Sequence, residues 1–131
     1  AVGQSGGIVG YSAHSLQGEY CFNYGDIDSA ANTAGVFGSI GNSKAYGNGG
    51  IVSTVKYCGN EGKVTSRTGY AGGVVGYTYG SGTAAVETNK HVEIYYCYNV
   101  GEVVAATAGK IASGILGYVN SRSRTASPAA R

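Results

Sequence analysis

Residues 93–103 read EIYYCYNVGEV, and EYCFNYGDI at 19–27 and KYCGNEGKV at 56–64 are variants of the same motif. Each copy contains Tyr-Cys-x-Asn-x-Gly, then a charged residue, then Ile or Val, and we call it the Cys motif. Successive copies lie 37 and 39 residues apart. A spacing of this size is typical of repeat proteins, in which each copy contributes one layer to a stack. The motif therefore predicts a chain of stacked, equivalent coils.

A second motif alternates with the Cys motif and consists of a glycine-flanked pair of apolar residues. We call it the Gly motif, and its copies are GGIVGY at 6–11, AGVFGS at 34–39, GGVVGY at 72–77 and SGILGY at 113–118. The segments from a Gly motif to the next Cys motif vary in length more than the returning segments, so insertions are expected on one side of the coils. NGGIVST at 48–54 is a competing Gly motif, which leaves the register of the second repeat open.

The composition favours a narrow interior built from β-strands. The 131 residues include 24 glycines and 12 tyrosines but two phenylalanines, no methionine and no tryptophan. Glycine at this density disfavours long helices, and short β-branched runs between glycines predict strands. We therefore predict an all-β fold, a parallel β-helix (β-solenoid) of roughly three to four coils with loop insertions. The solenoid spans 1–118, with repeats at approximately 1–30, 31–67 and 68–106 and a partial repeat at 107–118; a polar C-terminal tail follows at 119–131.

Stacking in register would place equivalent residues in columns about 4.8 Å apart from coil to coil. We expect three interior columns: an inner wall of aliphatic side chains, a row of thiols packed as small apolar groups, and side-chain amides that hydrogen-bond to their copies above and below. In that order, the columns are Ile8, Val36, Val74 and Ile115; Cys21, Cys58 and Cys97; and Asn23, Asn60 and Asn99.

Two features of the Cys motif bear on the path of the backbone. Gly25, Gly62 and Gly101 follow the amides by two residues, where a tight corner with positive φ is expected. Val55 and Ile94 lie three residues before their cysteines, so they face the same side as the thiols only if a bulge or corner intervenes. The position after the corner glycine carries Asp, Lys and Glu in successive copies, and stacking predicts attraction between these charges. These charged residues are Asp26, Lys63 and Glu102.

The outer surface is expected to be rich in tyrosine. The second apolar residue of each Gly motif lies next to the inner wall and should point outward, on the same side as the aromatic residue that closes the motif. These second residues are Val9, Phe37, Val75 and Leu116. The tyrosines form two columns, which serve either as stacked rings that stabilise the fold or as a platform for a sugar or a partner. They are Tyr20, Tyr57 and Tyr96 before the cysteines, and Tyr11, Tyr77 and Tyr118 at the end of the Gly motifs. The candidate binding surface is Tyr11, Tyr77, Tyr79 and Tyr118.

Charge and composition exclude several classes of function. The net charge of +2 is too small for a nucleic-acid-binding protein, and the chain has no run of about 18 apolar residues that would predict membrane insertion. The cysteines lack the CxxC or Cys/His spacing of a zinc site. The acids show no pair placed for glycoside hydrolysis, and His14 and His91 fall in loops of unrelated sequence. We therefore predict no catalytic residue, no cofactor and no metal ligand.

The alternating motifs resemble the GLUG-motif repeats of large bacterial surface and secreted proteins. YCYNVGEV at 96–103 and AGGVVGYTYG at 71–80 carry the resemblance, which extends over nearly the whole chain to about Tyr118. Ser39 and Gly59 depart from the pattern in the second copy. The resemblance implies a β-solenoid within long extracellular proteins, some of them attached to adhesion regions or to peptidases whose catalytic domains lie elsewhere. It implies no catalytic residue in this chain.

Repeat pattern and resemblance together predict a non-enzymatic structural or adhesive segment of a bacterial cell-surface or secreted protein, which mediates attachment or assembly. Expected partners are a host glycan or protein, or other copies that associate end to end through the open edges of the solenoid. Two alternatives stay open: a carbohydrate-binding module that uses outward-facing tyrosines, and a non-catalytic part of a secreted peptidase or glycosidase.

Overall fold

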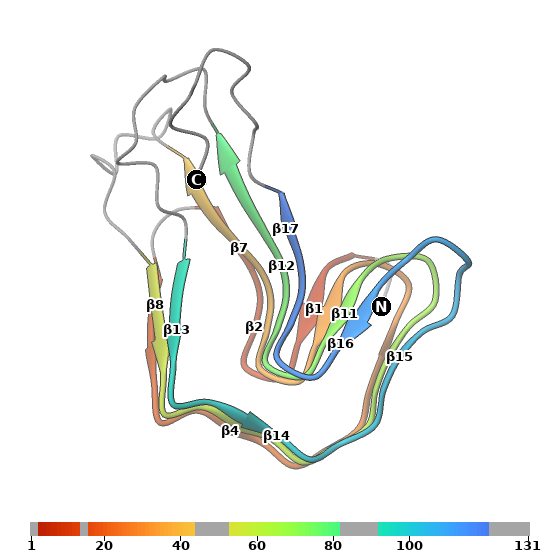
Figure 1. The fold of residues 1–131 in the computed structure, drawn as a ribbon, viewed down its shortest axis with the longest axis horizontal. Coiled ribbons are helices and arrows are strands. Elements are labelled where there is room, and N and C mark those ends of the chain that lie inside the picture. Colours follow the sequence, from red (N-terminus) through yellow and green to blue (C-terminus); the bar gives the residue numbers. More distant parts are fainter. Residues whose placement is uncertain (1–2, 14–15, 44–52, 82–91, 121–131) are drawn as a thin grey trace, which may run out of the picture.

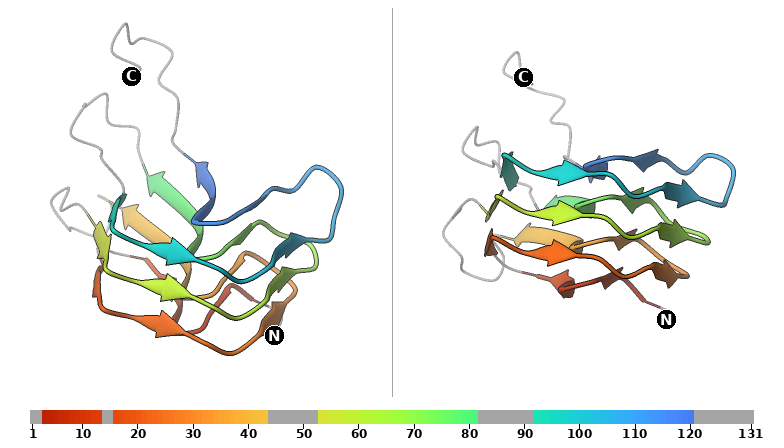
Figure 2. Two further views of the ribbon diagram at one scale, coloured as in Figure 1. Left: turned by 60° about the horizontal axis from the view of Figure 1, so that its bottom comes forward. Right: turned by 90° about the horizontal axis from the view of Figure 1, so that it is seen from below.

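The structure is a computed structural model and describes residues 3–13, 16–43, 53–81 and 92–120. All regular secondary structure in these ranges is β, and the 17 strands form five sheets in which every pairing is parallel (Figure 1). Successive coils lie one above the other when the stack is seen from the side (Figure 2). The prediction of an all-β parallel β-helix is confirmed.

Each full coil contains five short strands. The first coil is formed by β1 (Ser5–Gly6), β2 (Val9–Ser12), β3 (Gln17–Glu19), β4 (Phe22–Asn23) and β5 (Ile27–Ser29). The second is formed by β6 (Thr33–Ala34), β7 (Phe37–Ser43), β8 (Ser53–Lys56), β9 (Gly59–Asn60) and β10 (Val64–Ser66). The third is formed by β11 (Ala71–Gly72), β12 (Val75–Ser81), β13 (Val92–Tyr95), β14 (Tyr98–Asn99) and β15 (Val103–Ala105). A fourth coil begins with β16 (Ala112–Ser113) and β17 (Leu116–Asn120).

Strand pairing settles the register of the second repeat. Val9 lies opposite Phe37, and Phe37 lies opposite Val75, so the Gly motif at 34–39 is the second copy in the stack. The competing motif at 48–54 instead contributes its last two residues to β8, where they pair with β13. The Cys motifs are in register as well, because Asn23 lies opposite Asn60 and Asn60 opposite Asn99.

The corner within each Cys motif is made by its tyrosine and not by its glycine. Tyr20, Tyr57 and Tyr96 adopt positive φ values of 53°, 55° and 51°. Such values are rare for residues other than glycine, and here they turn the chain between the sheet of β8 and the sheet of β9. This corner allows Val55 and Cys58 to be buried in the same interior, although their spacing would place them on opposite faces of a regular strand.

The glycines after the amides have a different role from the predicted one. Among the described residues, the glycine with positive φ is Gly109. The predicted positive-φ corner at Gly25, Gly62 and Gly101 is therefore wrong. A Cβ on Gly62 would lie 2.0 Å from the carbonyl oxygen of Gly25, and one on Gly101 would lie 2.0 Å from that of Gly62. Glycine is required at 62 and 101 because adjacent coils approach too closely for a side chain, whereas a Cβ on Gly25 would meet nothing within 4 Å.

The Gly motif forms a re-entrant bend that reaches the amide column of the Cys motif. A Cβ on Gly35 would lie 2.2 Å from Asn60 Oδ1, and one on Gly73 would lie 2.4 Å from Asn99 Cγ. In Figure 1 this bend points toward the strip of β4 and β14, so it constricts the coil. We call the space between β7/β12 and β8/β13 the apolar lobe, and the space between β6/β11 and β10/β15 the polar lobe.

The predicted inner wall is buried in the second and third coils, but the apolar residues that follow it are not on the outside as expected. Val36 and Val74 are fully buried, but Phe37 and Val75 are buried as well, so the expectation that these second residues point outward is wrong. The ring of Phe37 points into the apolar lobe, where a Cβ on Gly18 would lie 2.4 Å from its Cζ. The reason is that the first residue of each pair lies in the bend before the strand, so strict alternation along a strand does not apply.

The first coil leaves part of the predicted inner wall open. Ile8 is 52% exposed, whereas its equivalents Val36 and Val74 are 0% exposed. Ile115, in the partial fourth coil, is partly buried and packs against the core. A residue in this column is therefore enclosed only where the described structure has a coil on either side of it.

Candidate functional site

The predicted amide column is present as a hydrogen-bonded ladder. Asn23 Nδ2 donates to Asn60 Oδ1 at 2.7 Å, and Asn60 Nδ2 donates to Asn99 Oδ1 at 2.7 Å. Each Nδ2 also donates to the carbonyl oxygen two residues later, as in the 2.7 Å bond from Asn60 to Gly62. Asn60 is fully buried. Because its donors and acceptor have partners within the chain, this amide column stabilises the stack.

The thiols also lie in one column and are free. Cys58 is buried, whereas Cys21 and Cys97 are partly buried at the two ends of the column. Each thiol donates to the carbonyl oxygen two residues earlier, with Sγ–O distances of 3.4, 3.3 and 3.2 Å along the stack. Burial raises the pKa of the Cys58 thiol to about 11, because desolvation disfavours the thiolate.

The described carboxylates interact with neighbouring groups on the outer surface. Lys63 Nζ lies 3.3 Å from Glu102, and Asp26 accepts the backbone N–H of Lys63 at 2.8 Å. These are the contacts that connect the predicted charge column. Further pairs join adjacent coils or neighbouring residues: Lys56–Glu19 at 3.1 Å, Arg67–Asp28 at 2.8 Å, Tyr98–Glu61 at 3.0 Å and Tyr95–Glu93 at 2.6 Å.

Two other kinds of site are absent from the described residues. No group of three or more His, Cys, Asp or Glu side chains within 3–13, 16–43, 53–81 and 92–120 is arranged to hold a metal ion. The same ranges contain no helix with the length and apolar character needed to cross a membrane. His14 and His91 lie outside the described residues.

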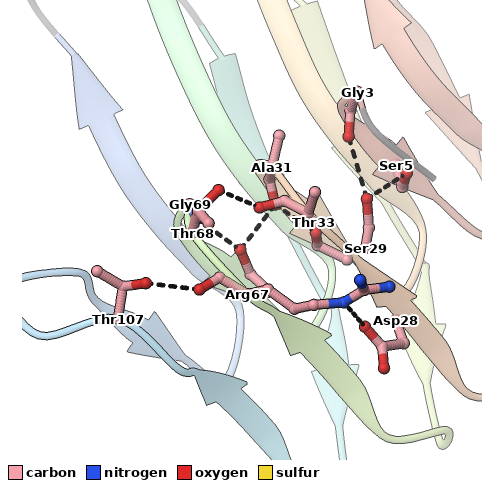
Figure 3. A network of polar contacts seen from close by, with 12 residues as sticks. Gly3, Ser5, Asp28, Ser29, Ala31, Thr33, Arg67, Thr68, Gly69 and Thr107 are labelled. Carbon is pink, nitrogen blue, oxygen red and sulfur yellow. Dashed lines mark hydrogen bonds and ion pairs between the residues drawn. The ribbon is translucent and has the colours of Figure 1, made fainter.

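The polar lobe is lined by hydroxyl groups that bond to the chain itself (Figure 3). Ser29 Oγ donates to the carbonyl oxygen of Gly3 at 3.0 Å and lies 2.8 Å from Ser5 Oγ. Ser66 Oγ donates to the carbonyl oxygen of Ala31 at 2.7 Å and accepts the backbone N–H of Gly69 at 2.9 Å. These bonds close the turns at this end of the coil and leave the serines engaged within the fold.

The tyrosines of the candidate binding surface are only partly brought together. The rings of Tyr77 and Tyr118 stack with centroids 5.5 Å apart, and Tyr70 stacks on Tyr118 at 4.3 Å. Tyr11 is half exposed and is separated from Tyr77 by the buried Ser39, which lies opposite both. The side chain of Tyr79 lies outside the described residues.

The structure reveals a larger exposed aromatic surface on the Cys motifs. It covers the tyrosine corners and the outer side of the sheet β4-β9-β14, and we call it the aromatic face. Its members are Tyr20, Phe22, Tyr24, Tyr57, Tyr95, Tyr96 and Tyr98, all of them exposed. The sequence holds the information to find part of it, because residues on either side of an inward-facing asparagine point outward by strand alternation. The sequence predicts a stacked column of the corner tyrosines but not the positive φ that turns the chain there.

Stacking fixes the rings of the aromatic face. Tyr20 and Tyr57 have ring centroids 5.0 Å apart, Tyr57 and Tyr96 5.3 Å, and each pair is within 9° of parallel. Tyr98 covers Gly59, where a Cβ would lie 2.1 Å from the ring, and reaches Phe22 at 6.2 Å between centroids. Gly59, which departs from the repeat pattern, is therefore covered by the ring of Tyr98 in the next coil.

Comparisons with protein-family models, with curated proteins and with solved structures found no match for this chain.

Proposed function

We propose that this chain is a non-enzymatic structural and adhesive β-solenoid segment of a bacterial cell-surface or secreted protein, and that it mediates attachment or assembly through the aromatic face. The observation that carries the proposal is the exposure of seven aromatic side chains on the corners and outer strip of the Cys motifs. Large exposed apolar patches mark sites of interaction with other molecules. Aromatic side chains are also the residues that contribute most to binding at protein interfaces.

The rigidity of the rings supports a role in binding. Tyr57 is held between Tyr20 and Tyr96, so its orientation is fixed before any partner arrives. Tyr95 and Tyr98 each donate a hydroxyl hydrogen bond to a glutamate, which fixes those two side chains in the same way. A preorganised surface loses less conformational entropy on binding than a mobile one.

The arrangement of the acids supports a role without catalysis. The six described carboxylates are distributed along the stack in pairs with lysine, arginine, tyrosine or a backbone N–H. A hydrolase of glycans would need two carboxyl groups on either side of a bound substrate. The GLUG resemblance, and with it the bacterial surface or secreted location, is part of the proposal and is supported by the motifs at 71–80 and 96–103.

The carbohydrate-binding alternative has less support on the tyrosines first considered. A sugar stacks on the open face of an aromatic ring, but Tyr77 and Tyr118 face each other and Tyr70. On the aromatic face, open ring surfaces are found at the ends of the tyrosine column. Tyr96, at one end, is 77% exposed, whereas Tyr57, in the middle, is 39% exposed. A protein or glycoprotein that contacts ring edges and hydroxyl groups fits this surface better.

The test compares Tyr24→Ser/Tyr96→Ser with a control, Tyr11→Ser/Ile111→Ser, which also removes two exposed apolar side chains but from other faces. Binding to immobilised collagen, fibronectin and mucin is measured by surface plasmon resonance, and self-assembly by sedimentation velocity. We expect the wild type and the control to bind or assemble, and the aromatic-face variant to lose about tenfold or more in affinity. Equal behaviour of the two variants, or a wild type that neither binds nor assembles, contradicts the proposal.

A further inference from the structure

The three thiols of the column are aligned and oriented alike, a regularity that packing as small apolar groups does not require. The backbone N–H of Gly59 donates to the carbonyl oxygen of Cys21 at 3.0 Å, and that of Tyr98 donates to the carbonyl oxygen of Cys58 at 3.0 Å. The three cysteines therefore lie directly above one another in adjacent coils. Each Sγ also makes the same contact with the carbonyl oxygen two residues earlier, so the three side chains have the same orientation.

Identical orientation fixes the separation of the sulfur atoms. Equivalent atoms on adjacent parallel strands are about 4.8 Å apart, so neighbouring Sγ atoms have about this separation. A disulfide requires sulfur atoms about 2.05 Å apart, which demands a rotation of both side chains and a closer approach of the coils. A metal ion midway between two thiolates, with metal–sulfur bonds no longer than the roughly 2.3 Å of zinc–thiolate bonds, requires a separation of at most about 4.6 Å. The column is close to the second requirement, and the two coils need to approach only slightly.

We propose that adjacent thiolates of this column bind Cu(I) as a linear, two-coordinate ion, with Cys58 as a ligand in both possible pairs, Cys21–Cys58 and Cys58–Cys97. Soft thiolate ligands select Cu(I) over harder cations. Zinc needs about four ligands, and within the described part of the chain no third His, Cys, Asp or Glu is arranged to join two of the thiols. The inference stands independently of the adhesive function.

Binding exchanges protons for the metal. Two S–H bonds break, two Cu–S bonds form and two protons pass to solvent; copper arrives and remains as Cu(I), so no electron donor or acceptor is needed. Because the pKa of Cys58 is raised to about 11, its thiol is protonated at neutral pH and the ion must displace that proton. Affinity should therefore rise with pH, by up to about tenfold per unit for each proton released.

The exposure of the three thiols is consistent with entry from the ends of the column. Cys58 is buried between its neighbours, while Cys21 and Cys97 are partly buried. An ion reaches an end thiol first and then the central one. Cys21 and Cys97 are separated by two coil spacings, about 9.6 Å, which is too far for both to bind one linear ion.

The experiment is an anaerobic competition for Cu(I) between the full chain and the chromogenic chelator bicinchoninate, on the wild type and on Cys21→Ser, Cys58→Ser and Cys97→Ser. We expect the two end variants to retain tight binding through the remaining pair. Cys58→Ser should lose about a hundredfold or more in affinity, because the second sulfur no longer acts as a tethered ligand. X-ray absorption of the loaded wild type should show copper with two sulfur neighbours.

Far-UV circular dichroism checks that each variant is folded, and Cys58→Ala provides a second form that lacks the central thiol. Equal weakening by all three serine variants would mean that the thiols bind one ion each and would overturn the proposal. Tight binding that survives in both Cys58 variants would overturn it as well. So would copper with three or four sulfur neighbours, or a wild type that fails to compete with the chelator.

Discussion

The two lobes of the coil enclose their interiors with different chemistry. The apolar lobe is filled by Phe37, Ile40, Val55 and Val75, all of them buried. The polar lobe is lined by Ser29, Thr33 and Ser66, which are equally buried but bond to carbonyl oxygens of nearby turns. The division is not complete, since Val64 is buried on the same side of β10 as Ser66, and Ser53 on the same side of β8 as Val55. Large apolar side chains nevertheless dominate one lobe, and hydrogen-bonded hydroxyl groups the other.

The difference follows from the turns and strands that border each lobe. The turns that close the polar lobe are short, spanning 30–32, 67–70 and 106–111 between strands, and they bring backbone carbonyl oxygens into the interior. Small hydroxyl side chains satisfy those oxygens without needing space. The apolar lobe is bordered by longer strands, β7 and β12, and accepts the ring of Phe37. The amide column separates the two environments, because it contacts the re-entrant bend of the Gly motif.

The largest effect is expected from emptying the apolar lobe. Phe37→Ala removes a fully enclosed ring whose far end contacts Gly18, and should lower the free energy of unfolding by about 4 kcal/mol. Urea denaturation followed by circular dichroism measures the change. Phe37→Leu is the matched control and should cost about half as much, because it fills part of the cavity. Similar small losses for both variants would show that the apolar lobe does not dominate stability.

Breaking the amide column should come next. Asn60→Ala deprives Asn23 of its acceptor, Asn99 of its donor and the Gly62 carbonyl oxygen of its partner, at a cost of about 3 kcal/mol. Asn23→Ala, at the open end of the column, is the control, since it breaks a single bond of the ladder. We expect it to cost about 1 kcal/mol. Equal losses at the two positions in urea denaturation would argue against a ladder whose central amide is the most important.

The thiol at the edge of the apolar lobe should make stability depend on alkaline pH. The pKa of Cys58 is raised from its ordinary 9.0 to about 11 in the fold by burial. As pH rises, the Cys58 thiol therefore loses its proton in the unfolded chain before it does so in the fold. The contribution of the protonated thiol to the free energy of unfolding is present below pH 9 and declines as pH rises toward 11. The decline should be about 2–3 kcal/mol in total, at about 1.4 kcal/mol per pKa unit.

Cys58→Ala serves as the reference for that measurement, because tyrosines ionise in the same range. The difference in unfolding free energy between wild type and variant should shrink between pH 9 and 11 and stay constant between pH 6 and 8. A constant difference across the whole range would mean that the Cys58 thiolate is as stable in the fold as in the unfolded chain.

The sequence predicted the columns better than the directions of individual side chains. Equal motifs on adjacent coils identify which residues are stacked, so the asparagine and cysteine columns follow from spacing alone. Direction depends on where the backbone bends. The sequence required a bulge or corner between Val55 and Cys58 but did not show which residue makes it, and the bend before β7 was not expected. Tyr57 turns the chain with a φ of 55°, a conformation that its residue type disfavours. Val36 lies in a bend before β7, so both it and Phe37 can be buried.

The aromatic face was not chosen as the candidate binding surface, for the same reason. The corner geometry moves Tyr20, Tyr57 and Tyr96 to the outside, and alternation from the corner then exposes Phe22 and Tyr98. Composition could not distinguish these rings from Tyr77 and Tyr118, which occupy an equally regular column but pack with Tyr70. Exposure is a property of the whole coil, and a repeated motif by itself does not determine it.

The smallest effect is expected in the polar lobe. Ser66→Ala removes a bond to the Ala31 carbonyl oxygen and leaves the N–H of Gly69 without its acceptor, so a loss of about 1–2 kcal/mol in urea denaturation is expected. The Ala31 oxygen keeps a second donor, Thr33 Oγ1 at 2.5 Å. The third coil already contains Ala105 opposite Ser66 and closes its lobe without that hydroxyl. A loss as large as that of Phe37→Ala would show that hydrogen bonds stabilise the coil as strongly as apolar burial, and would remove the distinction between the lobes.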